Sequence, residues 1–527
     1  MFRRSFLIPL MGLMLALVGC SDNGGGDANG QKPESLVIGL GGDAVSLDPA
    51  EVTDSVSENV SQSILETLVT FAEGETEVKP LLAKEWTESD DGLTYTLTIE
   101  EGVQFHDGTP LNAEAVVYNF ERWMNADEDK FFMYGSVFGG YKGDENHAIE
   151  SVKAVDDHKV EFKLKYPKPT FLKDLALTPF SISSPEAIEE HGENYGSNPV
   201  GTGPFTFQEW KRKNRVVLNK NEEYWVDGYP KVNQVVFRVI PDNSNRLNAL
   251  KSGEIHLMDG LSPENIEEIE NDENFKVFSR PSLNIGYLGF NVEKEPFDDK
   301  LVRQALNHAV DKGAIIKAFF AGQAEPAKNP IPPVVQGYND EIEEYEYDPE
   351  KAKELLDKAG HPDGFKMELW AMPVARPYMP DANKVAESIQ SDLSKVGVEA
   401  EIVSYEWATY LDKVKKGEAD SFILGWTGTN GDADDFIYNL WHEDNIGSLN
   451  STRYANDEVN SLLSEARKIT DQEKRNDLYG RVQEIMHEDP PIVPLVHATP
   501  ALAGRADLQG FDPHPTGRII TTEISFE

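Results

Sequence analysis

The residue pairs in this chain that could take part in catalysis do not form a complete site. His442 and Glu443, and again His487 and Glu488, begin like the helix of a zinc protease, but neither pair has the second histidine that must follow four residues later. A glycine-rich stretch at residues 39–44 follows a predicted strand. Residues 46–49 then continue as a turn and not as the helix whose N-terminus would hold a pyrophosphate. The sequence also lacks a Gly-Lys pair and a G-x-S-x-G turn, so it predicts a protein that is not an enzyme and needs no cofactor or metal.

Cys20 is the only cysteine in the chain, and the residues before it suggest a role for it. Arg3 and Arg4 precede a short apolar run at residues 6–18, which is the order of a secretory signal. Residues 17–20 (Leu-Val-Gly-Cys) look like a bacterial lipobox. We therefore expect residues 1–19 to be removed, Cys20 to carry lipid, and residues 20–35 to form a flexible tether. The alternative is an ordinary secreted protein with one stray thiol.

The charge of the chain limits its possible partners. The net charge is −43, and loss of Arg3 and Arg4 with the signal would make the mature chain −45. Such a field repels nucleic acid and anionic lipid head groups. We expect no nucleic-acid partner, contact with the membrane only through lipid on Cys20, and a position on the extracytoplasmic face of a bacterial membrane.

Alternating strands and helices must position any functional side chains. Residues 94–99 and 160–164 alternate apolar and polar side chains, which predicts strands. Asp348 and Pro349 open a predicted helix that Gly360 ends, and a second helix carries an apolar stripe from Val385 to Val396 before a strand at residues 398–403. Such units recur from about residue 298 to 425, which indicates an α/β lobe. The earlier third has more strands and turns, which suggests a second lobe of mixed type.

Several motifs resemble those of one family. The chain resembles the extracellular solute-binding proteins of peptide and nickel ABC importers, and the dipeptide-binding members in particular, from about residue 36 to its C-terminus. The stretches that carry the resemblance are residues 81–86 (LLAKEW), 102–108 (GVQFHDG), 199–205 (PVGTGPF), 369–378 (LWAMPVARPY) and 425–428 (GWTG).

The resemblance implies a two-lobed α/β fold of the periplasmic-binding-protein type, with a hinge between the lobes. Residues 36–282 would form lobe I, with an inserted subdomain at roughly 75–200. Residues 283–495 would form lobe II, and residues 496–527 would return to lobe I. The chain would cross between the lobes near residues 281–283 and 494–497. A ligand that touches both lobes then shifts the equilibrium between open and closed forms.

The resemblance also implies a ligand site. Arg376 matches the arginine that binds a ligand carboxylate, and a guanidinium can hold a carboxylate through two hydrogen bonds. Tyr378 is expected to contact the ligand, and Trp407 and Trp426 to form walls of the pocket. Alternatively, Arg376 pairs with one of the many acidic residues and the tryptophans belong to the core. Thr427 and Gly428 end a predicted strand, where a peptide could pair with exposed backbone groups as an added strand.

At one position the chain departs from the family pattern. The dipeptide binders have an aspartate after Trp-Thr-Gly that holds the ligand's α-ammonium group, and this chain has Thr429 there. Asp432 is the favoured substitute and Asp434 another; otherwise the ligand has no free amino group, or the pocket is wetter and binds less tightly. Gly42 and Asp43 are expected near the ligand from the first lobe, with a simple turn as the alternative.

The expected function is therefore binding and delivery. The protein would be a lipid-anchored, monomeric receptor that binds dipeptides or short peptides and presents them to the permease of an ABC importer. A nickel chelate, haem or an opine-like compound is the alternative cargo on the same fold, and a secreted hydrolase is a less favoured class.

Overall fold

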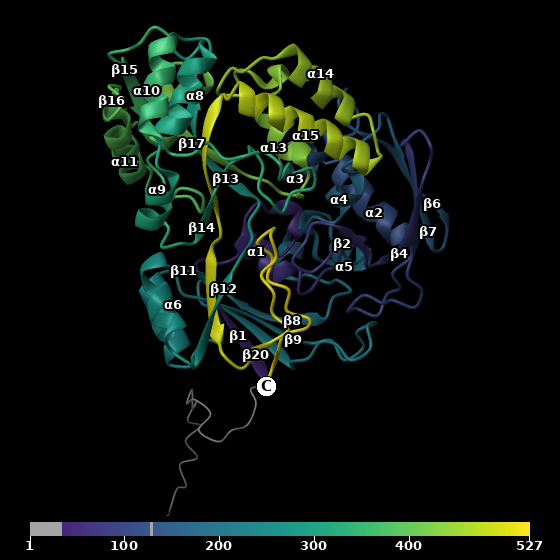
Figure 1. Cartoon of the computed structure of the whole chain (residues 1–527). Helices are drawn as coiled ribbons and strands as arrows, with labels where there is room; N and C mark the ends of the chain where they lie inside the picture. The colour runs from purple at the N-terminus through teal and green to yellow at the C-terminus, as the bar shows by residue number, and fades with distance from the viewer. Residues whose placement is uncertain (1–33, 127–129) are drawn as a thin grey trace, which may run out of the picture.

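The computed structural model describes residues 34–126 and 130–527, which fold around two large sheets (Figure 1). The predicted signal at residues 1–19, the lipidated Cys20 and the tether as far as residue 33 lie outside the described residues. The two sheets belong to two bodies, and the chain passes between them twice.

The first body contains a seven-stranded sheet that joins both ends of the described chain. β1 lies parallel to β10 and β11, while β19, from the C-terminal region, pairs with β11 and β12. In spatial order the strands are β12 (Phe275–Ser279), β19 (Ala501–Arg505), β11 (Leu257–Leu261), β1 (Ser35–Leu40), β10 (Gln234–Val239), β9 (Arg215–Lys220) and β8 (Phe205–Lys211).

The second body contains a six-stranded mixed sheet. Its central strands β13 and β18 are buried at every residue, because helices cover them. β17 is antiparallel to β13 along seven residue pairs but parallel to β15 only at Ser421 and Phe422. The order is β14 (Ala324–Pro326), β18 (Ile492–Ala498), β13 (Asn284–Phe290), β17 (Ser421–Thr427), β15 (Lys366–Trp370) and β16 (Glu399–Val403).

A four-stranded antiparallel sheet forms a subdomain within the first body. Its strands are β4 (Ala83–Glu88), β5 (Thr94–Ile99), β7 (Lys159–Leu164) and β6 (Ile149–Asp156). Its helices are α2 (Ala113–Met124), α3 (Phe132–Phe138) and α4 (Phe171–Leu175). An aromatic cluster that includes Phe120, Phe162 and Phe171 fills the space between the sheet and these helices. The short strands β2 (Val69–Phe71), β3 (Val78–Pro80), β20 (Leu508–Gln509) and β21 (Ser525–Phe526) complete the set that the structure describes.

The other α-helices are divided between the two bodies. In the first body they are α1 (Ser55–Ser61), α5 (Pro185–His191), α6 (Asn243–Lys251) and α7 (Ile266–Glu270). In the second body they are α8 (Lys300–Ala309), α9 (Lys312–Phe319), α10 (Pro349–Lys358), α11 (Ala382–Ser394), α12 (Trp407–Lys415), α13 (Ala433–Trp441), α14 (Asp457–Ala466) and α15 (Gln472–Glu488). The start of α13 lies beside α4 of the subdomain (Figure 1), where Asn430 and Asp174 are hydrogen bonded.

The local elements expected from the sequence agree with the structure. β5 and β7 contain the two alternating stretches, and α10 begins at Pro349 after the Asp348 side chain accepts hydrogen bonds from two backbone amides. α11 carries the expected apolar stripe, and the turn at Gly397 has a φ of +84°, which favours glycine. These predictions are confirmed. The sequence could predict these elements because each depends on neighbours within a few residues.

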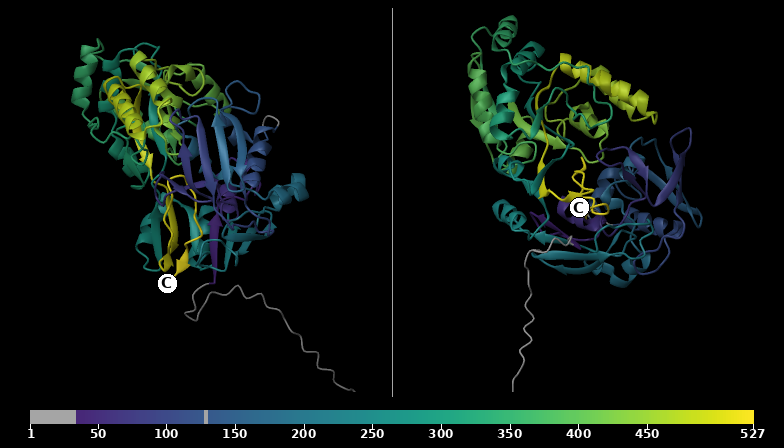
Figure 2. Two further views of the ribbon diagram at one scale, coloured as in Figure 1. Left: turned by 90° about the vertical axis from the view of Figure 1, so that its right-hand side faces the viewer. Right: turned by 60° about the horizontal axis from the view of Figure 1, so that its bottom comes forward.

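The chain crosses between the sheets after β12 and again after β18, and the yellow C-terminal strand can be followed from one body into the other in Figure 2. The first crossing lies at the expected residues 281–283. The second comes slightly later than residues 494–497, because β18 keeps its pairing with β14 up to Ala498. The Asn284 side chain also accepts a hydrogen bond from the Ala498 amide at 2.9 Å and donates one to its carbonyl at 2.9 Å.

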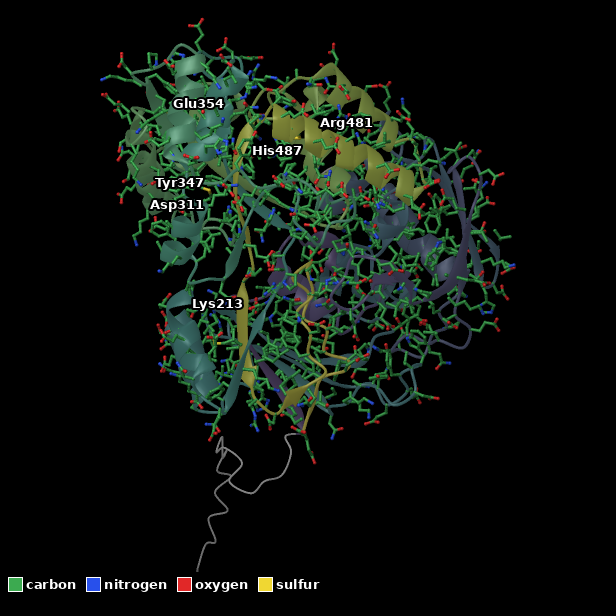
Figure 3. The ribbon with its side chains drawn as sticks, viewed as in Figure 1. Lys213, Asp311, Tyr347, Glu354, Arg481 and His487 are labelled. Carbon is green, nitrogen blue, oxygen red and sulfur yellow. The ribbon has the colours of Figure 1, made fainter. Side chains whose placement is uncertain are left out.

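Charged side chains cover the outer helix faces. Glu354 on α10 and Arg481 on α15 both lie at the surface in Figure 3, where each takes part in exposed ion pairs. None of the helices in residues 34–126 and 130–527 has both the length and the apolar composition required to cross a bilayer. The same residues contain no cluster of three or more His, Cys, Asp or Glu side chains placed to hold a metal ion.

Candidate functional site

A cavity of about 340 Å³ opens beside β17 in the second body. Five of the residues predicted for the site line it, although they come from a loop, a helix and a strand: Arg376, Tyr378, Trp407, Trp426 and Thr427. The other lining residues are Tyr287, Leu411, Lys415, Leu424, Gly425, Leu440, Ser448, Leu449 and Ser451. The wall is thus largely apolar and aromatic, with two cations and no carboxylate.

Arg376 is held by a tight turn after β15. Its backbone N–H donates to the Met379 carbonyl at 3.1 Å, and the Met379 N–H donates back at 2.9 Å. Pro377 occupies the second position of this turn, where a fixed φ favours the bend. The side chain is exposed, and its Cζ lies 5.4 Å from the centre of the Trp407 ring.

The Arg376 guanidinium has no acidic partner among the described residues, and it donates a hydrogen bond to the Ala375 carbonyl at 3.5 Å. The alternative of an arginine neutralised by a neighbouring acid is therefore not what the structure shows. A planar cation over an aromatic ring, at the edge of an apolar cavity, is suited to hold a carboxylate through two hydrogen bonds.

Aromatic side chains form the rest of the wall. Trp407, the first residue of α12, stacks on the buried Tyr410 with ring centres 5.8 Å apart and an interplanar angle of 17°. Trp407 and Trp426 are each half-buried, so one face remains available. Tyr378 is buried, and its ring packs against the backbone of β17.

Gly425 allows this close packing. A Cβ atom there would lie 2.3 Å from the Ile285 carbonyl oxygen and 2.4 Å from the Tyr378 ring. The first glycine of Gly-Trp-Thr-Gly, Gly425, is thus required because β13 and Tyr378 both lie close to this strand. Its backbone has no unusual φ that would require glycine.

We expect Gly425→Ala to destabilise the protein by about 1–3 kcal/mol, because an overpacked core must move backbone or aromatic atoms. Urea unfolding would measure the change. Gly313→Ala is the matched control, since its Cβ would meet only Asp311 Oδ1 at 3.5 Å. An unchanged urea midpoint for Gly425→Ala would show that this contact is not tight.

Beyond the cavity, the end of β17 approaches the start of α13. Gly428 donates its N–H to the Leu283 carbonyl at 2.7 Å. Thr429 donates its N–H to Asp435 Oδ2 at 2.7 Å and its hydroxyl to the same oxygen at 3.2 Å. The carboxylate beside Thr429 is therefore that of Asp435, which the sequence reasoning missed. The sequence does contain a signal for this contact. Asp435 lies three residues after the helix cap, and a side chain at that position turns back toward the residues before the helix.

Asp432 has a different role from the one expected. It caps α13, and its two carboxylate oxygens accept hydrogen bonds of 2.8 and 2.7 Å from Arg475 on α15. Lys173 of α4 lies 3.5 Å away. Burial alone would raise the pKa of Asp432, but Arg475 and Lys173 hold it well below its usual value. The carboxylate that the sequence analysis expects to receive a ligand ammonium is therefore buried and engaged with Arg475 and Lys173.

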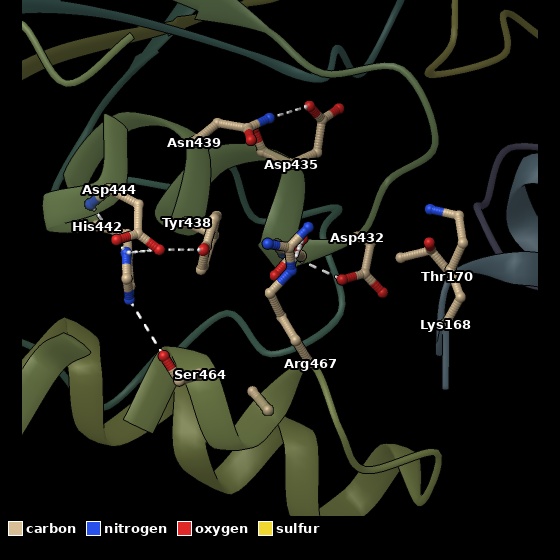
Figure 4. A network of polar contacts seen from close by, with 12 residues as sticks. Lys168, Thr170, Asp432, Asp435, Tyr438, Asn439, His442, Asp444, Ser464 and Arg467 are labelled. Atoms are coloured by element: carbon tan, nitrogen blue, oxygen red, sulfur yellow. Dashed lines mark hydrogen bonds and ion pairs between the residues drawn. The ribbon is translucent and has the colours of Figure 1, made fainter. Parts of the chain in front are cut away.

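Asp434 is also engaged, and the segment before it contacts the subdomain. Its carboxylate lies 3.3 Å from Arg467. Lys173 donates to the Gly431 carbonyl at 3.1 Å, and Asn430 donates to Asp174 at 2.9 Å. Figure 4 shows Asp432 facing Lys168 and Thr170 of the subdomain, with Asp435 directed instead toward Asn439. Residues 430–432 thus form a polar junction between the two bodies.

Gly42 and Asp43 do not join the cavity. The Asp43 carboxylate accepts hydrogen bonds from Trp210 Nε1 at 3.0 Å and from the Lys213 amide at 2.7 Å. It therefore holds the turn between β8 and β9. Within the described residues, no contact links these two positions to Arg376.

The fold and the cavity together define an extracytoplasmic solute-binding protein. The chain belongs to the bacterial extracellular solute-binding proteins, family 5, whose model matches residues 77–448. Members of this family bind substrates and are not enzymes, and the predicted two-lobed α/β fold is confirmed.

Among known proteins, the chain is 39% identical to the dipeptide-binding protein of Escherichia coli K12, over 94% of this chain and 95% of the relative. It is 37% identical to heme-binding protein A of Haemophilus influenzae, over 90% and 89% of the two chains. The solved structure of HbpA2 from Haemophilus parasuis superposes with a TM-score of 0.88 at 33% identity, covering 94% of this chain and all of that one.

Proposed function

We propose that this protein binds dipeptides or short peptides between two closing lobes and delivers them to an ABC importer. One observation carries the proposal: Arg376 lies in an aromatic cavity of about 340 Å³ and has no acidic partner in residues 34–126 and 130–527. The guanidinium would hold the C-terminal carboxylate of the peptide. The 39% identity to a protein named for dipeptide binding supports the same cargo.

The edge of β17 offers a place for the peptide backbone. Because β15 pairs with β17 only at Ser421 and Phe422, the stretch from Leu424 to Thr427 has no strand neighbour on that side among the described residues. A short peptide could add there as a strand, with its side chains in the space between Trp407 and Trp426. Backbone recognition of this kind accepts many side chains, which suits a receptor for varied peptides.

Two lobes joined by a hinge would enclose the peptide. Residues 36–282, with an insert at roughly 75–200, act as lobe I together with the C-terminal residues that follow β18. Lobe II begins at residue 283 and extends to the end of β18 at Ala498, slightly beyond the expected residue 495. The two crossings form the hinge, and ligand contacts made only in the closed form shift the population toward it. Lipid on Cys20 holds the monomeric receptor at the membrane, near the permease.

Isothermal titration would test the proposal. The mature protein without Cys20 is unfolded and refolded to remove carried-over ligand, and then titrated with a dipeptide and with its C-terminal amide. We expect binding of the free acid and a loss of at least about 30-fold for the amide, because the Arg376 site then lacks its anion. Failure to bind any of a mixed set of dipeptides would contradict the proposal.

A haem cargo is the second candidate, favoured by the 37% identity to a heme-binding protein and by the two cations, Arg376 and Lys415, that line the cavity. Two propionates could use both cations. Titration with hemin under the same conditions distinguishes the candidates, because peptide binding with no hemin binding leaves only the first.

A further inference from the structure

Three carboxylates stand at the start of α13, and their partners differ. Asp432 is paired with Arg475 and Lys173, and Asp434 with Arg467. Asp435 has no ion-pair partner within the part of the chain that the structure describes. Its carboxylate accepts hydrogen bonds from uncharged donors, Thr429 on one oxygen and Asn439 on the other. The start of α13 therefore carries one carboxylate whose charge is not neutralised.

Asp435 also lies close to the cavity, at the end of the wall that Thr427 forms. Thr427 lines the cavity, and two residues further along, Thr429 touches Asp435. Gly428 lies between them, where a Cβ atom would come within 3.2 Å of Asp435 Oδ2 and 2.4 Å of the Phe436 ring. The free edge of β17 thus runs from the cavity wall to this carboxylate. A peptide added along that edge could reach Asp435 with one terminus while Arg376 holds the other.

We propose that Asp435 is the residue that receives the ligand's α-ammonium group, in place of the aspartate expected at position 429. The inference rests on the proposed peptide function and names a residue that determines its specificity. Thr429 keeps a part in this arrangement, because its hydroxyl and amide orient the Asp435 carboxylate. The receptor would therefore require a free amino terminus although Thr429 itself carries no charge.

The surroundings of Asp435 favour binding of a positively charged ligand group. Burial raises its pKa to about 6, although hydrogen bonds from Thr429 act to lower it. Asp434 on the same helix adds a small repulsion, while Arg467 is engaged with Asp434. On the subdomain, Lys168 and Lys173 face Asp174 and Asp432 instead. An ammonium group at Asp435 would thus supply the charge that its surroundings lack.

The variants Asp435→Asn and Thr429→Asp, alone and combined, test the inference by titration with a dipeptide and its N-acetylated form. Asparagine keeps an oxygen for the Thr429 donors, so the local structure should persist. We expect Asp435→Asn to weaken binding of the free dipeptide by roughly 30-fold or more and to leave the weaker binding of the acetylated form unchanged. Addition of Thr429→Asp to Asp435→Asn should recover most of the loss, because the carboxylate returns to the neighbouring position.

The unmodified protein provides a test that does not depend on folding of a variant. Binding of an ammonium requires ionised Asp435, so affinity for the free dipeptide should fall about tenfold from pH 7 to pH 5. Affinity for the acetylated dipeptide should stay constant over this range.

The results separate this inference from the proposed function. If amidation of the C-terminus abolishes binding but acetylation and Asp435→Asn do not weaken it, the inference is overturned and the peptide function stands. If no peptide binds at all, the proposed function fails first. If acetylation abolishes binding while Asp435→Asn changes nothing, another group holds the amine.

Discussion

Arg376→Ala should weaken dipeptide binding by roughly 30-fold to a few thousandfold, which corresponds to about 2–5 kcal/mol for a carboxylate left without its partner in a closed site. Arg376 can have this effect because no described acid neutralises it and because Trp407 supports its guanidinium plane. Isothermal titration of the refolded protein with a free dipeptide would measure the loss.

A second variant at position 376 separates the contribution of the guanidinium geometry from that of its charge, and a variant elsewhere serves as the control. Arg376→Lys keeps the charge but loses the planar pair of donors, so we expect an intermediate loss. Arg481→Ala is the control, because this exposed arginine on α15 (Figure 3) forms ion pairs with Glu458 and Glu484 at the surface, away from the cavity lining. Equal affinities for the Arg376→Ala and Arg481→Ala proteins would rule out a role for Arg376 in ligand binding.

Asp432→Asn should lower the free energy of unfolding by about 3–5 kcal/mol, because it leaves the buried Arg475 charge without its counterion. Arg475 and Asp432 are each 1% exposed, so water cannot replace the lost pair. Urea unfolding at pH 7 would measure the change. Asp434→Asn, two residues away, is the matched control: its partner Arg467 is 46% exposed, so water can solvate the guanidinium after the change and we expect a loss within about 1 kcal/mol.

The pH dependence of this effect has a definite sign. The folded-state pKa of Asp432 lies below its unfolded value of about 3.9. The stabilisation is therefore fully present above that value and is lost as the pH falls further. The difference between the parent protein and Asp432→Asn should stay constant from about pH 5 to pH 8 and decrease below about pH 4. A difference that is already absent at pH 7 would show that the Asp432–Arg475 pair contributes little.

Close-range patterns predicted much of the molecule. The Asp348 cap, the stripe on α11 and the alternation in β5 depend on residues a few positions apart, so the sequence contains all the information that they need. The resemblance, carried by contiguous motifs, correctly implied the family and the two-lobed fold. It also pointed to residues that line the cavity, because Arg376 and Tyr378 lie in one motif and Trp426 and Thr427 in another.

The choice among the acidic residues after Trp426 required the tertiary structure. The sequence favoured Asp432, but packing of α13 against α15 brings that carboxylate to Arg475, which is 43 residues away in the chain. The same helix start turns Asp435 back toward Thr429, and no cation in the described part of the chain pairs with it. Asp43 likewise found partners far along the chain, at Trp210 and Lys213. In an acidic chain many carboxylates are chemically equivalent, and the folded contacts alone decide which are neutralised and which remain free for a ligand.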